Sequence, residues 1–170
     1  MTPGRACRLL SLLAFAGLAA CAQPPAKPAF YQDLGSPSAA IDTAAAANLI
    51  NNYRQNNGLP PLQVDPVLNQ IAQEQADLLA ARDSIQVSLG GERAIDARLK
   101  AAGYPAASAV ENVSAGYRTM AETFSGWREL KTHNAHMLDP NATRFGIATA
   151  YAPGSKYKVF WAGIFAAPAE

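Results

Sequence analysis

Residues 157–166 of this 170-residue chain are Tyr157-Lys-Val-Phe-Trp-Ala-Gly-Ile-Phe-Ala166, and every residue after Lys158 in this run is apolar. An extended segment of this composition has no polar face, so both of its faces must be covered by other parts of the fold. That pattern is typical of a central strand in a sheet with helices packed on both sides. We therefore expect these residues to form the middle strand of the fold.

Two further strands are predicted from segments that come earlier in the chain. Apolar residues alternate along 144–151, and the turn-forming residues 152–156 join this segment to the last strand. A shorter strand is predicted at 109–113, Ala-Val-Glu-Asn-Val. Because a short turn connects antiparallel neighbours, we expect the sheet to be mostly antiparallel.

Most of the predicted helices precede these strands. The first helix is expected to end at 56–58, Asn-Asn-Gly. Asp65 and Pro66 supply an N-cap and a first-turn proline for a second helix, and Thr119 and Glu122 have the spacing of a capping box. Helices followed by a mostly antiparallel sheet indicate an α+β fold in which the helices pack on the sheet in layers.

Composition excludes several classes of function. The chain has 14 Lys plus Arg against 13 Asp plus Glu, so it lacks the basic excess that binding to a nucleic-acid backbone requires. Its two cysteines, Cys7 and Cys21, both lie near the N-terminus. A disulfide framework or a cysteine-ligated zinc site is therefore excluded for the rest of the chain.

Histidine chemistry is confined to one short segment. The only two histidines are His133 and His136, and Thr132 is expected to cap the helical turn that holds them. A spacing of three places the two imidazoles on neighbouring faces of a helix, although such a pair alone is weak evidence for a metal site. We expect a structural or solvent-facing role for His136 rather than metal ligation.

The N-terminal segment has the features of a secretory signal. Arg5 and Arg8 precede an apolar run at 9–18, which is too short to cross a bilayer as an ordinary helix. The sequence 18–21, Leu-Ala-Ala-Cys, resembles the lipobox of bacterial lipoproteins, and this resemblance implies cleavage before Cys21 and its lipidation. An ordinary signal peptide with an incidental cysteine is the alternative.

This interpretation divides the chain into three parts. Residues 1–20 are predicted to be a lipoprotein signal peptide, 21–40 a proline-rich tether that begins at lipidated Cys21, and 41–168 the folded domain. The predicted location is the cell envelope, anchored to a membrane by the acyl chains on Cys21. Ala22 resembles an outer-membrane sorting signal, so we expect the outer membrane facing the periplasm, or the cell surface.

Four segments of the predicted domain match one family pattern in order. They are 51–62, then 111–116 (Glu-Asn-Val-Ser-Ala-Gly), then Trp127 with 133–138, and finally 144–148. Together they resemble a bacterial member of the CAP family, also called the SCP-like family, which includes cysteine-rich secretory proteins. The resemblance implies a three-layer α-β-α sandwich, in agreement with the α+β fold expected above.

Members of this family often carry two histidines and two acids in a surface cleft that can hold a divalent metal. The resemblance places Glu111 and His133 at two of these four positions. At the other two, this chain has Val87 instead of a histidine and Leu130 instead of an acid, with Glu129 one residue away. Because two protein ligands hold zinc weakly, no metal and no other cofactor is expected.

Three functions remain open after these exclusions. The first is a non-catalytic binding module for an apolar small molecule, a lipid or an envelope partner, with Glu111, His133, Val87 and His136 in its cleft. The second is a protease-like or cell-wall-directed hydrolase in which Glu111 and His133 act as an acid/base pair. The third is a purely structural envelope protein. The broken tetrad favours the first.

Overall fold

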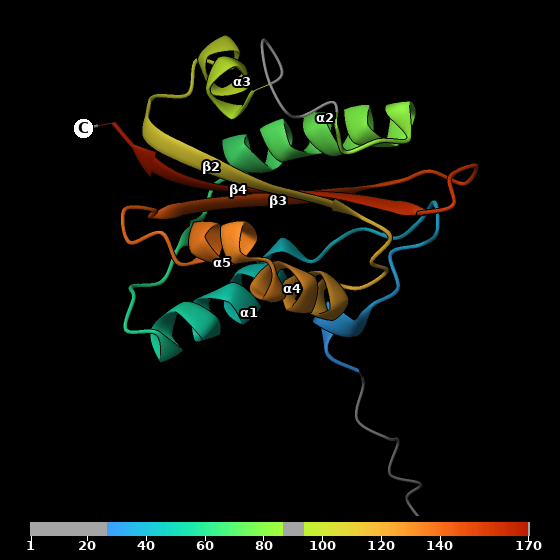
Figure 1. The fold of residues 1–170 in the computed structure, drawn as a ribbon, viewed down its shortest axis with the longest axis horizontal. Coiled ribbons are helices and arrows are strands. Elements are labelled where there is room, and N and C mark those ends of the chain that lie inside the picture. Colours follow the sequence, from blue (N-terminus) through green and yellow to red (C-terminus); the bar gives the residue numbers. More distant parts are fainter. Residues whose placement is uncertain (1–26, 87–93, 170) are drawn as a thin grey trace, which may run out of the picture.

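A four-stranded sheet lies between two layers of helices in the computed structural model, which describes residues 27–86 and 94–169 (Figure 1). The strand order is β1-β3-β4-β2, and β4 pairs antiparallel with both of its neighbours. The short β1 pairs parallel with β3, so the sheet is mixed. The strands are β1 (Gln63–Val64), β2 (Ala106–Ala115), β3 (Arg144–Tyr151) and β4 (Val159–Pro168).

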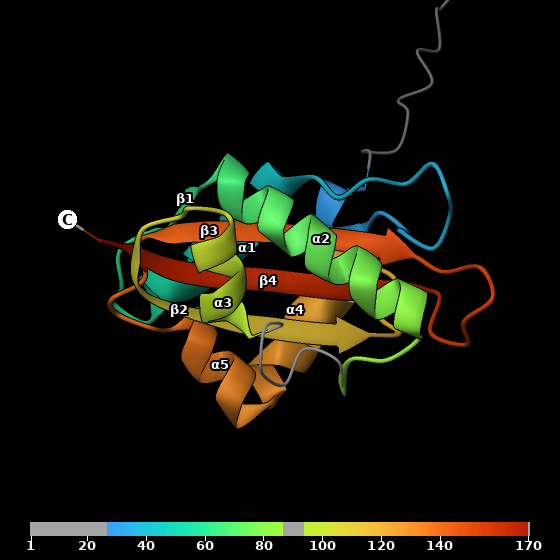
Figure 2. The same ribbon diagram turned by 90° about the horizontal axis from the view of Figure 1, so that it is seen from above.

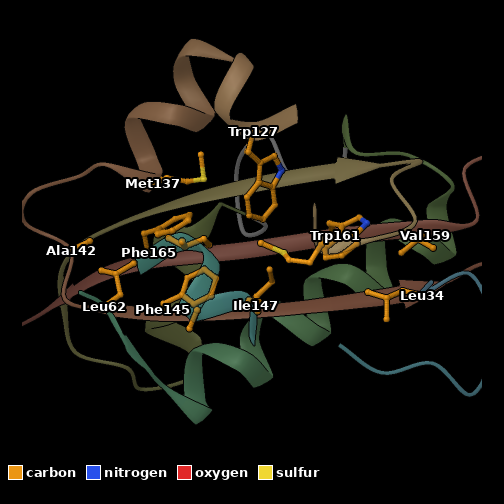
Figure 3. Packing of buried hydrophobic residues seen from close by; sticks show 14 residues of the cluster. Leu34, Leu62, Trp127, Met137, Ala142, Phe145, Ile147, Val159, Trp161 and Phe165 are labelled. Carbon is orange, nitrogen blue, oxygen red and sulfur yellow. The ribbon is translucent and has the colours of Figure 1, made fainter. Parts of the chain in front are cut away.

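The structure confirms that the last strand is central and covered on both faces. Every residue from Val159 to Phe165 is buried. Trp161 and Phe165 point into a cluster with Trp127 (Figure 3). Ala162 and Ile164 belong to a second cluster on the opposite face. The chain is thus an α+β protein with one core on each side of the sheet.

Five helices of the described chain cover the sheet, α2 and α3 on one face and α1, α4 and α5 on the other (Figures 1 and 2). Asp65 caps α2 as predicted, because its side chain accepts hydrogen bonds from two backbone amides of the first turn. Thr119 and Glu122 form both halves of the predicted capping box of α4. The helices are α1 (Thr43–Asn56), α2 (Pro66–Arg82), α3 (Ile95–Ala101), α4 (Met120–Glu129) and α5 (Lys131–Met137).

Three local features differ from what the sequence predicted. The sequence missed β1, whose two residues follow the proline pair at 60–61, and β2 is ten residues long where only 109–113 was predicted. Thr132 does not cap α5. Leu130 is both the C-cap of α4 and the N-cap of α5, and its side chain makes no capping hydrogen bond. Thr132 instead lies exposed inside the first turn of α5.

Part of the segment predicted as a tether packs on the domain. A short 3-10 helix, η1 (Ala29–Tyr31), is followed by Leu34, which is buried in the same cluster as Trp127. The backbone amide of Leu34 donates to the carbonyl of Arg118, whose guanidinium lies 2.8 Å from the Asp33 carboxylate. Cys21 and the predicted signal peptide lie outside the described residues. In the part of the chain that is described, no helix is long and apolar enough to cross a membrane.

Candidate functional site

Glu111 lies on β2, at the edge of the sheet, and forms an ion pair with α3. Its Oε2 atom is 2.8 Å from Nη2 of Arg98, and the two side chains are only 9% and 14% exposed. Burial raises the pKa of Glu111 above its ordinary value, and the nearby Arg98 opposes this rise. The carboxylate is therefore engaged within the α2/α3 layer.

Neighbouring residues of β2 point to opposite layers, as the strand geometry requires. Glu111 stands opposite Ile164 of β4, which belongs to the cluster on the α2/α3 side. Asn112 stands opposite Gly163, against which Trp127 of α4 packs so closely that a Cβ atom there would lie 2.6 Å from the indole. Asn112 therefore faces the α1/α4/α5 layer, on the other side of the strand from the Glu111 side chain.

Asn112 joins β2 to α5 through both ends of its amide. The side chain is fully buried, and its Nδ2 atom donates to the carbonyl oxygen of His133 at 3.0 Å. Its Oδ1 atom lies 2.8 Å from Nδ1 of His136, which also lies 3.2 Å from the carbonyl oxygen of Glu111. Because both neighbours of Nδ1 are acceptors, Nδ1 carries the proton and the neutral ring keeps its lone pair on Nε2. His136 thus positions α5 on the sheet edge.

His133 lies on the same helix, next to an aromatic ring. Its imidazole packs edge-on against Trp127, with ring centroids 6.4 Å apart, and its buried Nδ1 atom has no hydrogen-bond partner among the described residues. Burial lowers the pKa of His133, and the neighbouring His136 lowers it further. Burial also lowers the pKa of His136, an effect opposed by its hydrogen bond to the Glu111 backbone and by Asp139. Both imidazoles are therefore expected to be neutral at pH 7.

The structure does not join the two residues that sequence analysis paired. The Glu111 carboxylate is bound to Arg98 on one face of β2, and His133 packs against Trp127 on the other. Within residues 27–86 and 94–169, no hydrogen bond or ion pair links the Glu111 carboxylate to His133. The same residues contain no group of three His, Cys, Asp or Glu side chains that could hold a metal ion. Val87 lies outside the described residues.

Comparison with known proteins now identifies the family. Residues 47–165, about 70% of the chain, match the sequence profile of the Cysteine-rich secretory protein family, CAP. The chain belongs to the CAP family. The arrangement of helices on a mixed four-stranded sheet is thus that of a CAP domain.

Relatives of this CAP domain include proteins longer than this chain. The uncharacterized protein YkwD of Bacillus subtilis is 27% identical over 99 residues, which cover 58% of this chain and 38% of YkwD. An extracellular protein containing a SCP domain from Bacillus anthracis superposes with a TM-score of 0.62 at 19% identity, covering 72% of this chain and 39% of that one. An outer surface protein from Borrelia burgdorferi superposes with a TM-score of 0.66 at 17% identity, covering 77% of this chain and 98% of that one. This chain therefore spans less than half of the first two proteins, and the structural matches establish the fold alone.

Sequence analysis missed two arginines that shape this CAP domain. Arg54 of α1 is fully buried and donates hydrogen bonds to the backbone carbonyls of Pro60, Met137, Asp139 and Ala142. It therefore holds the end of α5 against α1. A signal for its burial was present, since Arg54 lies four residues after Ile50 on the same face of the helix. The pairing of Arg98 with Glu111 had no comparable signal.

The CAP domain also has a hollow beside α4, on the α1/α4/α5 side of the sheet. It has a volume of about 540 Å³ and is flanked by the rings of Tyr31 from η1 and Tyr117 from the loop before α4. Gly126 forms part of its floor, where the Tyr117 ring lies so close that a Cβ atom would clash with it. Glu129 lines this hollow, and the neighbouring Leu130 is 54% exposed.

Proposed function

We propose that this CAP-domain protein is a lipid-anchored, extracytoplasmic binding module without hydrolytic activity. The observation that carries the proposal is the separation of Glu111 from His133 by β2, together with the ion pair between Glu111 and Arg98. An acid/base pair must reach the same water or substrate atom within hydrogen-bond distance. The ion pair of the Glu111 carboxylate with Arg98 and the packing of the His133 ring against Trp127 support the view that these two residues do not act as such a pair.

The anchor in this proposal is Cys21, at the end of the lipobox-like sequence 18–21. Several acyl chains on one cysteine bind a membrane stably, whereas a single chain does not. Two structural relatives support the location outside the cytoplasm, because one is described as extracellular and the other as an outer surface protein. Ala22 after the cysteine favours the outer membrane over the inner one.

The ligand in this proposal is an apolar small molecule or lipid, and the hollow between η1 and α4 suits it best. Two tyrosine rings offer apolar surface, and Ser125 and Glu122 at the rim offer polar contacts. Tyr31 is 54% exposed, so its ring can be covered by a ligand at little cost to the fold.

Two experiments test the proposed function. Cys21→Ala is expected to leave an unprocessed, unacylated precursor, whereas the matched variant Cys7→Ala should be processed and should partition with membranes as the parent does. In the second experiment, the purified protein is extracted with organic solvent and the extract is analysed by mass spectrometry. An apolar molecule should be found with the parent and with the control Tyr157→Ala, which changes a tyrosine outside the hollow. Less of this molecule should be found with Tyr31→Ala, which changes the hollow itself. A hydrolytic activity that both Glu111→Gln and His133→Ala abolish while staying folded would contradict the binding-module proposal.

A further inference from the structure

The outer edge of β3 is only partly covered by another strand. β1 pairs with Arg144 and Phe145, and the amides of Gln63 and Asp65 donate to carbonyls at this end of β3. The chain then turns into α2 at Pro66, so no strand of the described chain continues along the edge beyond this point.

Beyond β1, two amide side chains of α2 form hydrogen bonds with the β3 backbone, where a further strand would otherwise pair. The Ile147 amide donates to Oδ1 of Asn69 at 2.9 Å, and Nε2 of Gln73 donates to the Thr149 carbonyl at 3.1 Å. Both contacts show that Ile147 and Thr149 direct their backbone groups away from β4 and toward the open edge.

Between these two side chains, one backbone carbonyl and one backbone amide of β3 have no hydrogen-bond partner among the described residues. They are the Ile147 carbonyl and the Thr149 amide, which face the same edge. In a parallel pair of strands, a single residue donates its N–H to one such carbonyl and accepts from the amide two residues later. The free groups of Ile147 and Thr149 have this arrangement, which one residue of an added strand would satisfy.

A groove of about 640 Å³ follows this edge. Its walls are β3, one side of α2 and the segment that precedes α1, which runs beside β3 in Figure 2. Asp77 of α2 is exposed and is the only charged side chain among the described residues that line the groove. A strand residue placed opposite Ala148 would turn its side chain to the α2 face, as Ala148 itself does, and hence toward Asp77.

We propose that this groove binds an extended peptide that adds to the edge of β3 as a parallel strand, with a Lys or Arg side chain opposite Ala148. The backbone groups of Ile147 and Thr149 supply the pairing, and the Asp77 carboxylate selects the basic side chain. This site is separate from the hollow beside α4 and does not depend on the lipid anchor.

The test measures binding of a fluorescein-labelled peptide, Thr-Val-Lys-Val-Thr, by fluorescence anisotropy. Thr149→Pro removes the free N–H, and proline is tolerated on an edge strand where the N–H points outward. The control Thr149→Val keeps the N–H and the shape of the side chain. Binding by the parent and by Thr149→Val should agree within about twofold, and Thr149→Pro should weaken binding at least about tenfold.

A second arm of the experiment leaves the protein unchanged. N-methylation of the peptide's lysine removes the N–H predicted to bind the Ile147 carbonyl and should abolish binding, whereas N-methylation of the following valine should not. The proposal is overturned if the parent shows no binding at about 1 mM peptide. It is also overturned if the two methylated peptides bind equally, if Thr149→Pro folds and binds as the parent does, or if the groove is closed by dimerisation of the chain.

Discussion

Glu111 and Asn112 are adjacent in one motif, yet they serve different layers of the molecule. Glu111 forms an ion pair with α3 on one face of β2, while Asn112 fastens α5 to the other face through His133 and His136. The α3 contact includes an ion pair, whereas the α5 contact is a network of partly buried hydrogen bonds. Because neighbouring side chains of a strand point to opposite faces of the sheet, two consecutive residues of a strand motif do not necessarily belong to one site.

The largest effect is expected on the α5 side, from Arg54→Met. This change removes four hydrogen bonds to buried or partly buried carbonyls and should lower the free energy of unfolding by about 4 kcal/mol. The exposed Arg128→Met is the matched control and should change it by less than about 0.5 kcal/mol. Chemical denaturation measures both. Equal stability of the two variants would mean that Arg54 does not hold α5 in place.

A smaller but more local effect is expected from Asn112→Ala. The change leaves the His133 carbonyl and Nδ1 of His136 without their buried partner and should cost about 2 kcal/mol. Hydrogen exchange should become faster in α5 and stay unchanged in α3. Faster exchange in α3 alone would mean that Asn112 does not face the layer assigned to it.

On the α3 side, the expected effect of Glu111→Gln depends on pH. The pKa of Glu111 is raised in the folded state, so its contribution to stability is fully present below its ordinary pKa and is lost as the pH rises through the raised pKa. Glutamine cannot titrate. The stability of Glu111→Gln relative to the parent should therefore rise as the pH increases from the ordinary glutamate pKa through the raised pKa of Glu111. Denaturation across this pH range decides the matter, and a falling relative stability would contradict a raised pKa.

The smallest effect is expected from His133→Phe. The new ring can keep the edge-on packing against Trp127, so stability at pH 7.5 should change by less than about 1 kcal/mol. The pKa of His133 is lowered in the folded state, so the parent loses stability as the pH falls below the ordinary histidine pKa. His133→Phe should lose less stability under acid than the parent does. A steeper acid loss in the variant would indicate a raised pKa instead.

Local patterns in the sequence predicted most of the elements, but not the way their side chains meet. The apolar run to Ala166 predicted a central strand, and the spacing of Thr119 and Glu122 predicted the start of α4, because each depends on residues close together in the chain. β1 was missed because two residues give no periodicity, and its pairing with β3 comes from tertiary contacts.

The candidate site was predictable only in part. The family resemblance selected Glu111 and His133, and the histidine spacing added His136; all three lie at the β2 edge or on the helix beside it. The partner of Glu111 is Arg98, thirteen residues earlier on a separate helix, and no sequence pattern relates the two. The ion pair of Glu111 with α3 and the packing of His133 against Trp127 therefore could not be predicted without the packing of α3 and α5.

The separation of Glu111 from His133 by β2 is tested most directly by an NMR titration of the Glu111 carboxyl carbon. The titration is carried out on the parent, on Arg98→Met and on His133→Ala. Because Arg98 opposes the effect of burial, its removal should raise the pKa of Glu111 further. Removal of His133, in the other layer, should leave that pKa unchanged. A pKa of Glu111 that responds to His133→Ala and ignores Arg98→Met would show that the acid and the histidine form one site, and would contradict their separation by β2.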